Sequence, residues 1–296
     1  MSTEDINSNT LDLDQKTTLE ILERMNDEDC IPPKAVRGAI PAIARVVDFL
    51  VEQYPRGGRV LYLAAGTSAR IAVMDAAECP PTFGTAPDWL QVRIAGGTNA
   101  VFCAQEGEED GEGEGARAVE EWHAGEMDCV IGIAASGHTP FVLAGLRKAR
   151  QMGAFTAMVS ANQVTQDLAD VMICCETGPE VITGSTRLKA ASAAKLVLNM
   201  ISTTTMTRLG RVYGNRMCYI RTNNQKLLTR AYRTLEECCN LSSQKAMELY
   251  RAADSDLAIA LVASLGCVPV EQARAALERT CGHVRRAIDA LKEESQ

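Results

Sequence analysis

The chain has 296 residues, 46% of them hydrophobic and 23% charged, a composition typical of a globular protein with one large domain and an appendage or two modest domains. A net charge of −8 without a long Lys/Arg run argues against a nucleic-acid partner, and no apolar stretch approaches the length of a membrane span. The polar N-terminus lacks a signal-peptide pattern, and the eleven cysteines contain no Cys-x-x-Cys pair. We therefore expect a cytoplasmic protein with reduced thiols and no metal site.

The N-terminal part of the chain predicts a tail followed by two helices. We expect residues 1–10 to be disordered. Apolar residues at helical spacing then predict one helix from Thr17 and a second over about 33–53, where Val36 and Leu50 belong to a continuous apolar face.

From Arg59 onward, short apolar runs alternate with helical patterns. Such alternation predicts βαβ units and a mainly parallel sheet in a three-layer α/β/α fold. The runs that predict central strands are 59–64, 89–95, 129–135, 154–160 and 171–175. Ligands of such folds bind beyond the carboxyl ends of the strands.

Small polar residues follow three of these runs. Gly66-Thr67-Ser68 comes after the first, Ser136-Gly137-His138-Thr139-Pro140 after the third, and Ser160-Ala161-Asn162 after the fourth. Free N–H groups and hydroxyls at a strand-to-helix turn, with the helix dipole behind them, favour a bound phosphate. The alternative is an ordinary Ser/Thr or proline helix start without a ligand. Neither Walker A nor Gly-x-Gly-x-x-Gly spacing is present.

A cluster of hydroxyls and cations, Ser185 to Lys189, opens the next long helix. Cations at a helix N-terminus are electrostatically misplaced unless an anion lies nearby, although a solvated basic turn is an equal alternative. From about residue 225 the sequence is helical, and starts at Ser242, Asp254 and Pro269 predict a small bundle of three amphipathic helices.

Two acidic features are candidates for chemistry. Glu78 precedes Cys79-Pro80-Pro81, where we expect proline to end the helical geometry and so hold the carboxylate in a cleft; an exposed helix end is the alternative. The acidic, Gly-rich tract 106–115 predicts a mobile solvated loop, and composition alone does not select one of its glutamates.

Taken together, these segments resemble the N-acetylmuramic acid 6-phosphate etherase family, within the sugar-isomerase superfamily of phosphosugar-binding domains. The resemblance extends in order over about residues 17–230, and its most specific motif is Glu78-Cys-Pro-Pro-Thr82. It implies an N-terminal tail and helices over 1–50, a phosphosugar-binding domain over 51–230 and a C-terminal helical bundle over 231–296.

The resemblance also implies a reaction and a site. The family cleaves the D-lactyl ether of N-acetylmuramic acid 6-phosphate, a small-molecule phosphosugar, by elimination and then hydration, without metal or other cofactor. By motif position, the proton donor is Glu78 and the second active glutamate is Glu109. The residues expected to hold the phosphate are Thr67, Ser68, Ser136, Gly137 and Thr139, and those expected to close the site, near a homodimer interface, are Ser185, Arg187 and Lys189.

Three positions depart from the family pattern. Ala69 and Ala191 stand where glycine is usual, and His138 stands where arginine is usual. Because alanine disfavours positive φ, we expect the first loop to adopt another geometry or fit a different ligand; we expect His138 to face solvent. An aldose-ketose phosphosugar isomerase and a phosphosugar-sensing regulatory protein are the competing functions. The isomerase needs no acid aimed at C3, and the sensor needs no pair of carboxylates beside an anionic ligand.

Overall fold

The computed structural model describes residues 2–105, 107–164, 167, 169–220 and 224–294. These form two compact units, which are described separately. The first comprises Met1–Ala76 and Pro87–Ser202, and the second comprises Ala77–Ala86 and Thr203–Gln296.

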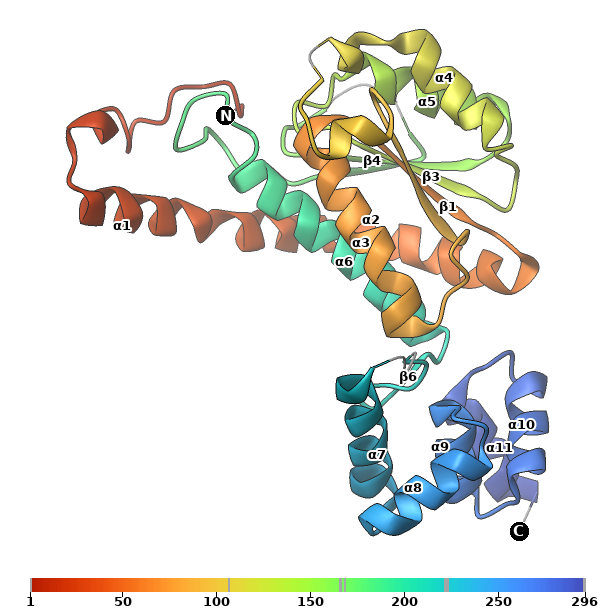
Figure 1. The fold of residues 1–296 in the computed structure, drawn as a ribbon. Coiled ribbons are helices and arrows are strands. Elements are labelled where there is room, and N and C mark those ends of the chain that lie inside the picture. Colours follow the sequence, from red (N-terminus) through yellow and green to blue (C-terminus); the bar gives the residue numbers. More distant parts are fainter. Residues whose placement is uncertain (1, 106, 165–166, 168, 221–223, 295–296) are drawn as a thin grey trace. The chain divides into compact units, whose positions relative to one another are not determined.

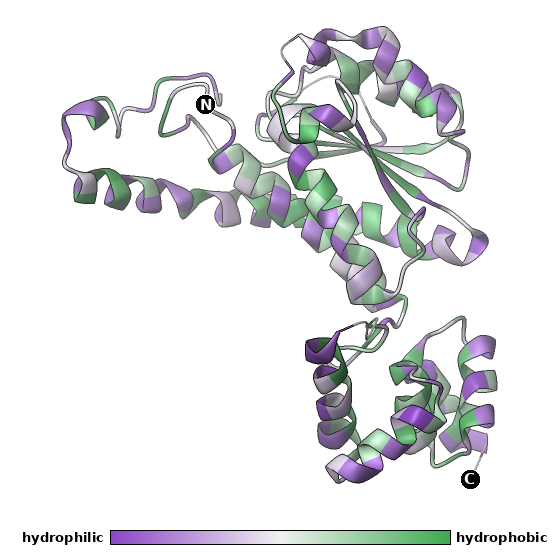
Figure 2. Cartoon of the chain, in the orientation of Figure 1, coloured by the Kyte–Doolittle hydropathy of each residue, from purple (hydrophilic) through white to green (hydrophobic). Residues whose placement is uncertain are grey.

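The first unit is built on a parallel sheet of five strands in the order β2-β1-β3-β4-β5 (Figure 1). The strands are β1 (Val60–Ala64), β2 (Leu90–Ile94), β3 (Cys129–Ile133), β4 (Phe155–Ser160) and β5 (Val171–Cys174). All five predicted runs are therefore strands, and the predicted parallel sheet is confirmed. Figure 2 shows hydrophobic residues along these strands, as expected for a sheet buried on both faces.

Helices cover both faces of the sheet. Those that begin in the first unit are α1 (Thr18–Asp29), α2 (Ile31–Gln53), α3 (Gly66–Phe83), α4 (Glu112–Glu121), α5 (Pro140–Gln151) and α6 (Lys189–Arg208). The short 3₁₀ helices are η1 (Leu13–Gln15), η2 (Tyr54–Arg56), η3 (Thr98–Val101) and η4 (Glu108–Asp110).

Side chains of β1 alternate between the two faces and so define the three layers. Leu61 and Leu63 belong to the core cluster that includes residues of α4 and α5. Tyr62 points the other way, and its hydroxyl donates to Asp75 of α3 at 3.0 Å. Asp75 also accepts from Asn199 of α6 at 2.5 Å, so one buried carboxylate joins β1, α3 and α6.

The expectation of a disordered N-terminal tail was wrong for the described residues 2–10. Thr3, Asn7 and Thr10 are all buried. Their polar groups bond to loops that lie far along the sequence, and these bonds offset the entropy of ordering the segment. Hydroxyl and amide side chains gave the segment a polar composition, and for that reason the sequence suggested solvent exposure.

Two local expectations also need correction. Helix α3 continues through Pro80 and Pro81 to Phe83, because proline only disfavours the helical geometry of the preceding residue and burial of Cys79 and Phe83, four residues apart, favours it. The acidic tract is not a loop throughout, since α4 begins at Glu112. Its Glu106 lies outside the described residues.

The second unit contains the end of α3, a short antiparallel pair and a helical bundle. Its strands are β6 (Val212–Tyr213) and β7 (Arg216–Met217), and its described helices are α7 (Gln225–Cys239), α8 (Ser243–Ala252), α9 (Leu257–Gly266), α10 (Val270–Arg279) and α11 (Val284–Glu294). Ser242 and Pro269 precede helices as predicted, but Asp256 rather than Asp254 caps α9.

Helix α9 is the centre of this bundle. It is buried on all sides rather than amphipathic, and its residues dominate the apolar cluster of the unit. Among the described residues, no single helix has both the length and the apolar composition of a membrane span; the bent pair α9 and α10 reaches them only when counted together.

Candidate functional site

The loops that follow β1, β3 and β4 meet at the carboxyl edge of the sheet, as predicted. A small cavity there is lined by Ser68, Ala135, Ser160, Cys175 and Ala190, so these loops share one space with the start of α6. The cavity holds about 10 Å³, which leaves room for no more than one water molecule. The floor beneath the three loops is therefore closely packed.

Gly137 shapes the loop between β3 and α5. Its φ of +83° lies in the left-handed region, and a Cβ at this position would stand 2.4 Å from Cγ2 of Val164 and 3.2 Å from Oγ of Ser160. Only glycine allows both the turn and this close approach. The backbone of Ser136–Thr139 is therefore held against the loop that follows β4.

The hydroxyls of this loop lie at the N-terminus of α5. Thr139 occupies the N-cap position with Pro140 after it, yet within the described structure no backbone N–H donates a capping bond to the Thr139 side chain. The Ser136 Oγ accepts from the His138 N–H at 3.2 Å, and His138 is exposed, as expected. Uncapped N–H groups and the dipole of α5 make this turn suited to an anion.

The first loop contributes Thr67 and Ser68, both half-buried, at the start of α3. Gly66 supplies the positive φ, +53°, where the chain turns from strand to helix. The expected disturbance at Ala69 is not seen: this residue is fully buried in the helix, and its N–H donates to the Ala65 carbonyl at 3.2 Å. Its alanine thus fits the turn without strain.

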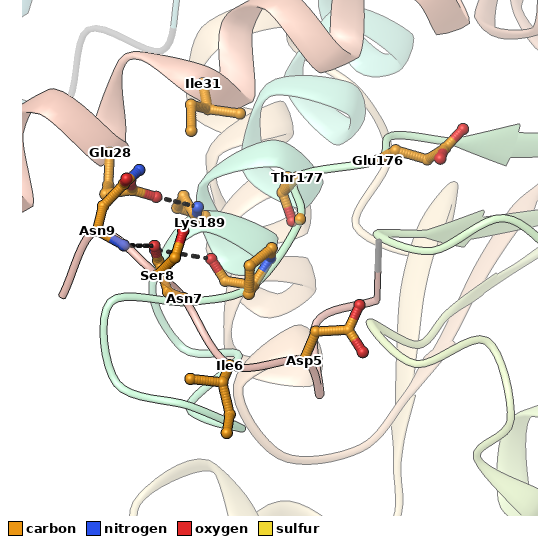
Figure 3. A pocket seen from close by; sticks show the side chains of 12 residues that line it. Asp5, Ile6, Asn7, Ser8, Asn9, Glu28, Ile31, Glu176, Thr177 and Lys189 are labelled. Atoms are coloured by element: carbon orange, nitrogen blue, oxygen red, sulfur yellow. Dashed lines mark hydrogen bonds and ion pairs between the residues drawn. The ribbon is translucent and has the colours of Figure 1, made fainter. Parts of the chain in front are cut away.

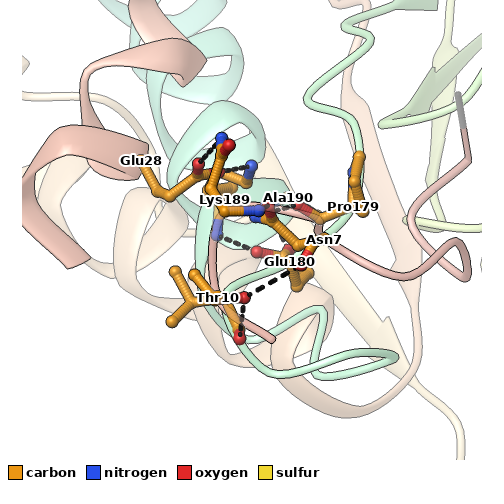
Figure 4. A network of polar contacts seen from close by, with 9 residues as sticks. Asn7, Thr10, Glu28, Pro179, Glu180, Lys189 and Ala190 are labelled. Atoms are coloured by element: carbon orange, nitrogen blue, oxygen red, sulfur yellow. Dashed lines mark hydrogen bonds and ion pairs between the residues drawn. The ribbon is translucent and has the colours of Figure 1, made fainter. Parts of the chain in front are cut away.

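The start of α6 already has anions of its own. The buried Glu180 carboxylate accepts from the N–H groups of Lys189 and Ala190, at 2.9 and 3.0 Å, and the Lys189 ammonium is ion-paired with Glu28 (Figure 4). Burial raises the pKa of Glu180, and these N–H bonds only partly offset it. Lys189, the cation that looked misplaced in the sequence, therefore has its counter-anion, Glu28, within the same chain.

The three residues expected to close the site lie in different surroundings. Helix α6 begins at Lys189, so Ser185 and Arg187 belong to the preceding turn rather than to its first turn. Ser185 is half-buried and Arg187 is exposed, whereas the Lys189 side chain is 1% exposed. In this structure the Lys189 ammonium is paired with Glu28.

Beside this ion pair lies a cavity of about 600 Å³, bordered by the N-terminal segment and the loop after β5 (Figure 3). Its lining includes the carboxylates of Asp5, Glu28 and Glu176, and the Lys189 cation is already paired. Like charges disfavour a phosphate here. The loops at the ends of β1 and β3 are the better anion site.

The two candidate catalytic glutamates are both exposed. Glu78 lies on α3, ten residues after Ser68, in the stretch that belongs to the second unit. Glu109 lies in η4 of the first unit, next to the equally exposed Glu108. Exposure therefore does not show which of Glu108 and Glu109 is the catalytic residue.

The sequence interpretation missed one residue that organises the loops. Arg70 of α3 donates to the carbonyls of Ala100 and Val101, both at 2.9 Å, and so fixes η3. Asn162 was named as part of the polar loop after β4, but its contact with the loop after β3 was not predicted. Its position two residues beyond a strand end was the only signal for it, since a long-range partner is not visible in sequence.

Comparison with known proteins identifies relatives over the whole chain. Residues 42–150 match the family described as glucokinase regulatory protein N-terminal SIS domain. The chain is 42% identical over 294 residues to the N-acetylmuramic acid 6-phosphate etherase of Clostridium beijerinckii, which covers 98% of this chain and 96% of that protein. It is 43% identical over 291 residues to that of Geobacillus thermodenitrificans, covering 98% and 99%.

Among solved structures, the phosphoheptose isomerase of Francisella tularensis has a TM-score of 0.51 at 17% identity. The match covers 65% of this chain and 100% of that one. At this identity the likeness concerns the fold, and it agrees with the layered parallel sheet of the first unit.

Proposed function

Because the chain belongs to the N-acetylmuramic acid 6-phosphate etherase family, we propose how its own residues cleave the ether of N-acetylmuramic acid 6-phosphate. The protein is a carbon–oxygen lyase of amino-sugar metabolism in peptidoglycan recycling. Identity above 40% over almost the full length of both chains carries this conclusion. It favours the lyase over the isomerase and sensor alternatives.

We assign the 6-phosphate to the carboxyl edge of the sheet. The phosphate is surrounded by N–H groups at the start of α5, which follow the turn at Gly137, and by the hydroxyls of Thr67, Ser68, Ser136 and Thr139. Ser185 and Arg187 close over it from the turn before α6, and Lys189 positions that turn through its pair with Glu28. Support comes from the shared floor of the loops and the uncapped helix start.

The chemistry is an elimination followed by a hydration. Glu109 first removes the C2 proton, which the open-chain aldehyde at C1 acidifies, to give an enolate; Glu78 then protonates the departing lactyl oxygen as the C3–O bond breaks. The products of this step are D-lactate and a C2–C3 alkene. Water then adds at C3, and the ionised Glu78 takes a proton from this water. Glu109 returns a proton to C2, which gives N-acetylglucosamine 6-phosphate.

We further propose that a second copy of the chain completes the site. An acid needs burial to keep its proton at neutral pH, and Glu78 is exposed in the single chain. Cover from a second copy at a homodimer interface meets this need.

We place the enzyme in the cytoplasm. All eleven cysteines are free thiols, and burial raises the pKa of Cys175, beneath the phosphate loops, to about 12. Free thiols persist in a reducing compartment, and the protonated Cys175 thiol takes no part in the reaction.

The test is release of D-lactate from N-acetylmuramic acid 6-phosphate, without added metal. We expect wild type to release it and Glu78→Gln, which keeps the size of the side chain but not the acid, to lose about 10²- to 10⁴-fold in kcat. The Glu78→Gln protein must elute at the size of wild type, as dimer, so that the loss reports chemistry and not assembly. Undiminished release from Glu78→Gln would refute the assignment.

A further inference from the structure

The N-terminal segment, residues 2–10, lies across the loops at the carboxyl edge of the sheet in the first unit. The Asn7 carboxamide donates to the Pro179 carbonyl at 3.3 Å, and the Thr10 hydroxyl donates to the Val181 carbonyl at 3.0 Å (Figure 4). Asn9 donates to Glu28, the partner of Lys189, at 3.1 Å (Figure 3). The segment thus holds the chain that leads into α6.

Its first contact reaches a different loop. Thr3 is fully buried, its N–H donates to Oδ1 of Asn162 at 2.9 Å, and its Oγ1 accepts from Nδ2 of Asn162 at 3.0 Å. A backbone N–H only donates, so this pairing fixes which end of the carboxamide is oxygen. The nitrogen of Asn162 must therefore face away from the Thr3 N–H.

That nitrogen points at the phosphate loop. Asn162 Nδ2 donates to the Ala135 carbonyl at 3.1 Å, one residue before Ser136, and lies 3.5 Å from the Ser136 carbonyl. The Ala135 carbonyl also accepts from the Ala161 N–H at 3.0 Å and from the Ser160 hydroxyl at 3.3 Å. Asn162 is the contact that connects the N-terminal segment to this carbonyl.

We propose that Thr3 and Asn162 are positioning residues for phosphate recognition: Thr3 orients the Asn162 carboxamide, which in turn holds the Ser136–Thr139 loop in its binding conformation. Neither residue touches the phosphate. The proposal rests on the phosphate site assigned above, and it gives the N-terminal segment a role in substrate affinity rather than in stability alone.

Two substitutions at Thr3 separate these roles. Thr3→Val keeps the shape and the backbone N–H but removes the hydroxyl that accepts from Asn162. Thr3→Ser keeps that hydroxyl. The Thr3 hydroxyl also lies 3.5 Å from the exposed Glu4 carboxylate, so Glu4→Gln serves as control for that weaker contact.

Affinity for N-acetylglucosamine 6-phosphate, measured by calorimetry, is the main readout, together with KM and kcat. One lost hydrogen bond in the relay predicts affinity and KM poorer by about three- to tenfold for Thr3→Val, with kcat within about twofold of wild type. Thr3→Ser and Glu4→Gln keep wild-type affinity. A Thr3→Val protein that unfolds at lower temperature but binds like wild type would overturn the proposal.

Asn162→Asp provides a second, stronger test. The carboxylate still accepts from the Thr3 N–H, but it turns an oxygen instead of an N–H toward the Ala135 carbonyl, so we expect a loss of affinity of more than about tenfold. Wild-type affinity in Asn162→Asp would also overturn the proposal. Ser136→Ala tests the phosphate site separately from the positioning role of Thr3 and Asn162. If Ser136→Ala binds N-acetylglucosamine 6-phosphate like wild type, the phosphate site itself is misassigned, whatever the Thr3 variants do.

Discussion

The buried pair of Glu28 and Lys189 makes a quantitative prediction about the first unit. The two side chains are 8% and 1% exposed, so removal of one partner leaves the other charge out of water without compensation. Each single change, Glu28→Gln or Lys189→Met, should lower the free energy of unfolding by about 3–5 kcal/mol. With a urea m-value of about 2 kcal/mol/M, the unfolding midpoint falls by about 1.5–2.5 M.

The double variant measures how much the two side chains of the pair stabilise each other, apart from their contacts with other residues. Once both charges are gone neither member of the pair is left as an unpaired buried charge, so Glu28→Gln with Lys189→Met should lose less than the sum of the single losses, by at least about 2 kcal/mol. Urea unfolding followed by tryptophan fluorescence is the assay. Trp89 and Trp122 are the two tryptophans of the sequence, both buried in the first unit, so the signal reports this unit alone. If the two single losses simply add in the double variant, the side chains do not stabilise each other as an ion pair.

The same pair predicts a dependence on pH. Burial acts to raise the pKa of Glu28, but hydrogen bonds from Lys189 and Asn9 outweigh it and hold the pKa below its ordinary value. Its stabilisation is therefore present above the pKa of an unfolded glutamate, about 4.3, and is lost as pH falls through the lower folded value. The difference in the free energy of unfolding between wild type and Glu28→Gln should therefore become smaller as the pH falls.

Glu180 has the opposite sign: its raised pKa gives a contribution that is full at low pH and is lost as pH rises through the folded value. Glu180 is present in wild type and in Glu28→Gln alike, so the part of its effect that does not depend on Glu28 is common to both proteins. A difference between the two proteins that stays constant from pH 7 to about pH 3.5 would contradict the assignment of the lowered pKa to Glu28.

Two further substitutions test the site. Glu109→Ala should lose at least about 10²-fold in kcat for D-lactate release while the equally exposed Glu108→Ala stays near wild type, and equal losses would count against Glu109 as the C2 base. Gly137→Ala should raise KM and cost about 1–3 kcal/mol in urea unfolding, because it forces a Cβ into Val164 at positive φ; an unchanged KM would remove this loop from the phosphate site.

The sheet could be predicted because its strands are short, buried apolar runs with a strong local signal. Polar loops at strand ends could be predicted to meet at one edge, since parallel topology brings carboxyl ends together. Gly137 and Ser160 do pack against each other there. Features that depend on local sequence patterns could therefore be predicted from the sequence alone.

Long-range polar pairing could not be read in this way. Thr3 and Asn162 are 159 positions apart, and Glu28 and Lys189 are 161 apart, so no periodicity connects them. The N-terminal segment looked solvated because the groups that satisfy it lie elsewhere in the chain. Glu78 posed a related difficulty, because burial of Cys79 and Phe83 carried the helix past two prolines.

In the proposed mechanism Glu78 is the acid and Glu109 is the base, and hydrogen exchange at C2 separates the two roles. Glu78→Gln is incubated with N-acetylmuramic acid 6-phosphate in deuterium oxide and followed by NMR. We predict deuterium at C2 without release of D-lactate in Glu78→Gln, and neither in Glu109→Ala. Loss of C2 exchange in Glu78→Gln, or exchange that persists in Glu109→Ala, would contradict the division of roles.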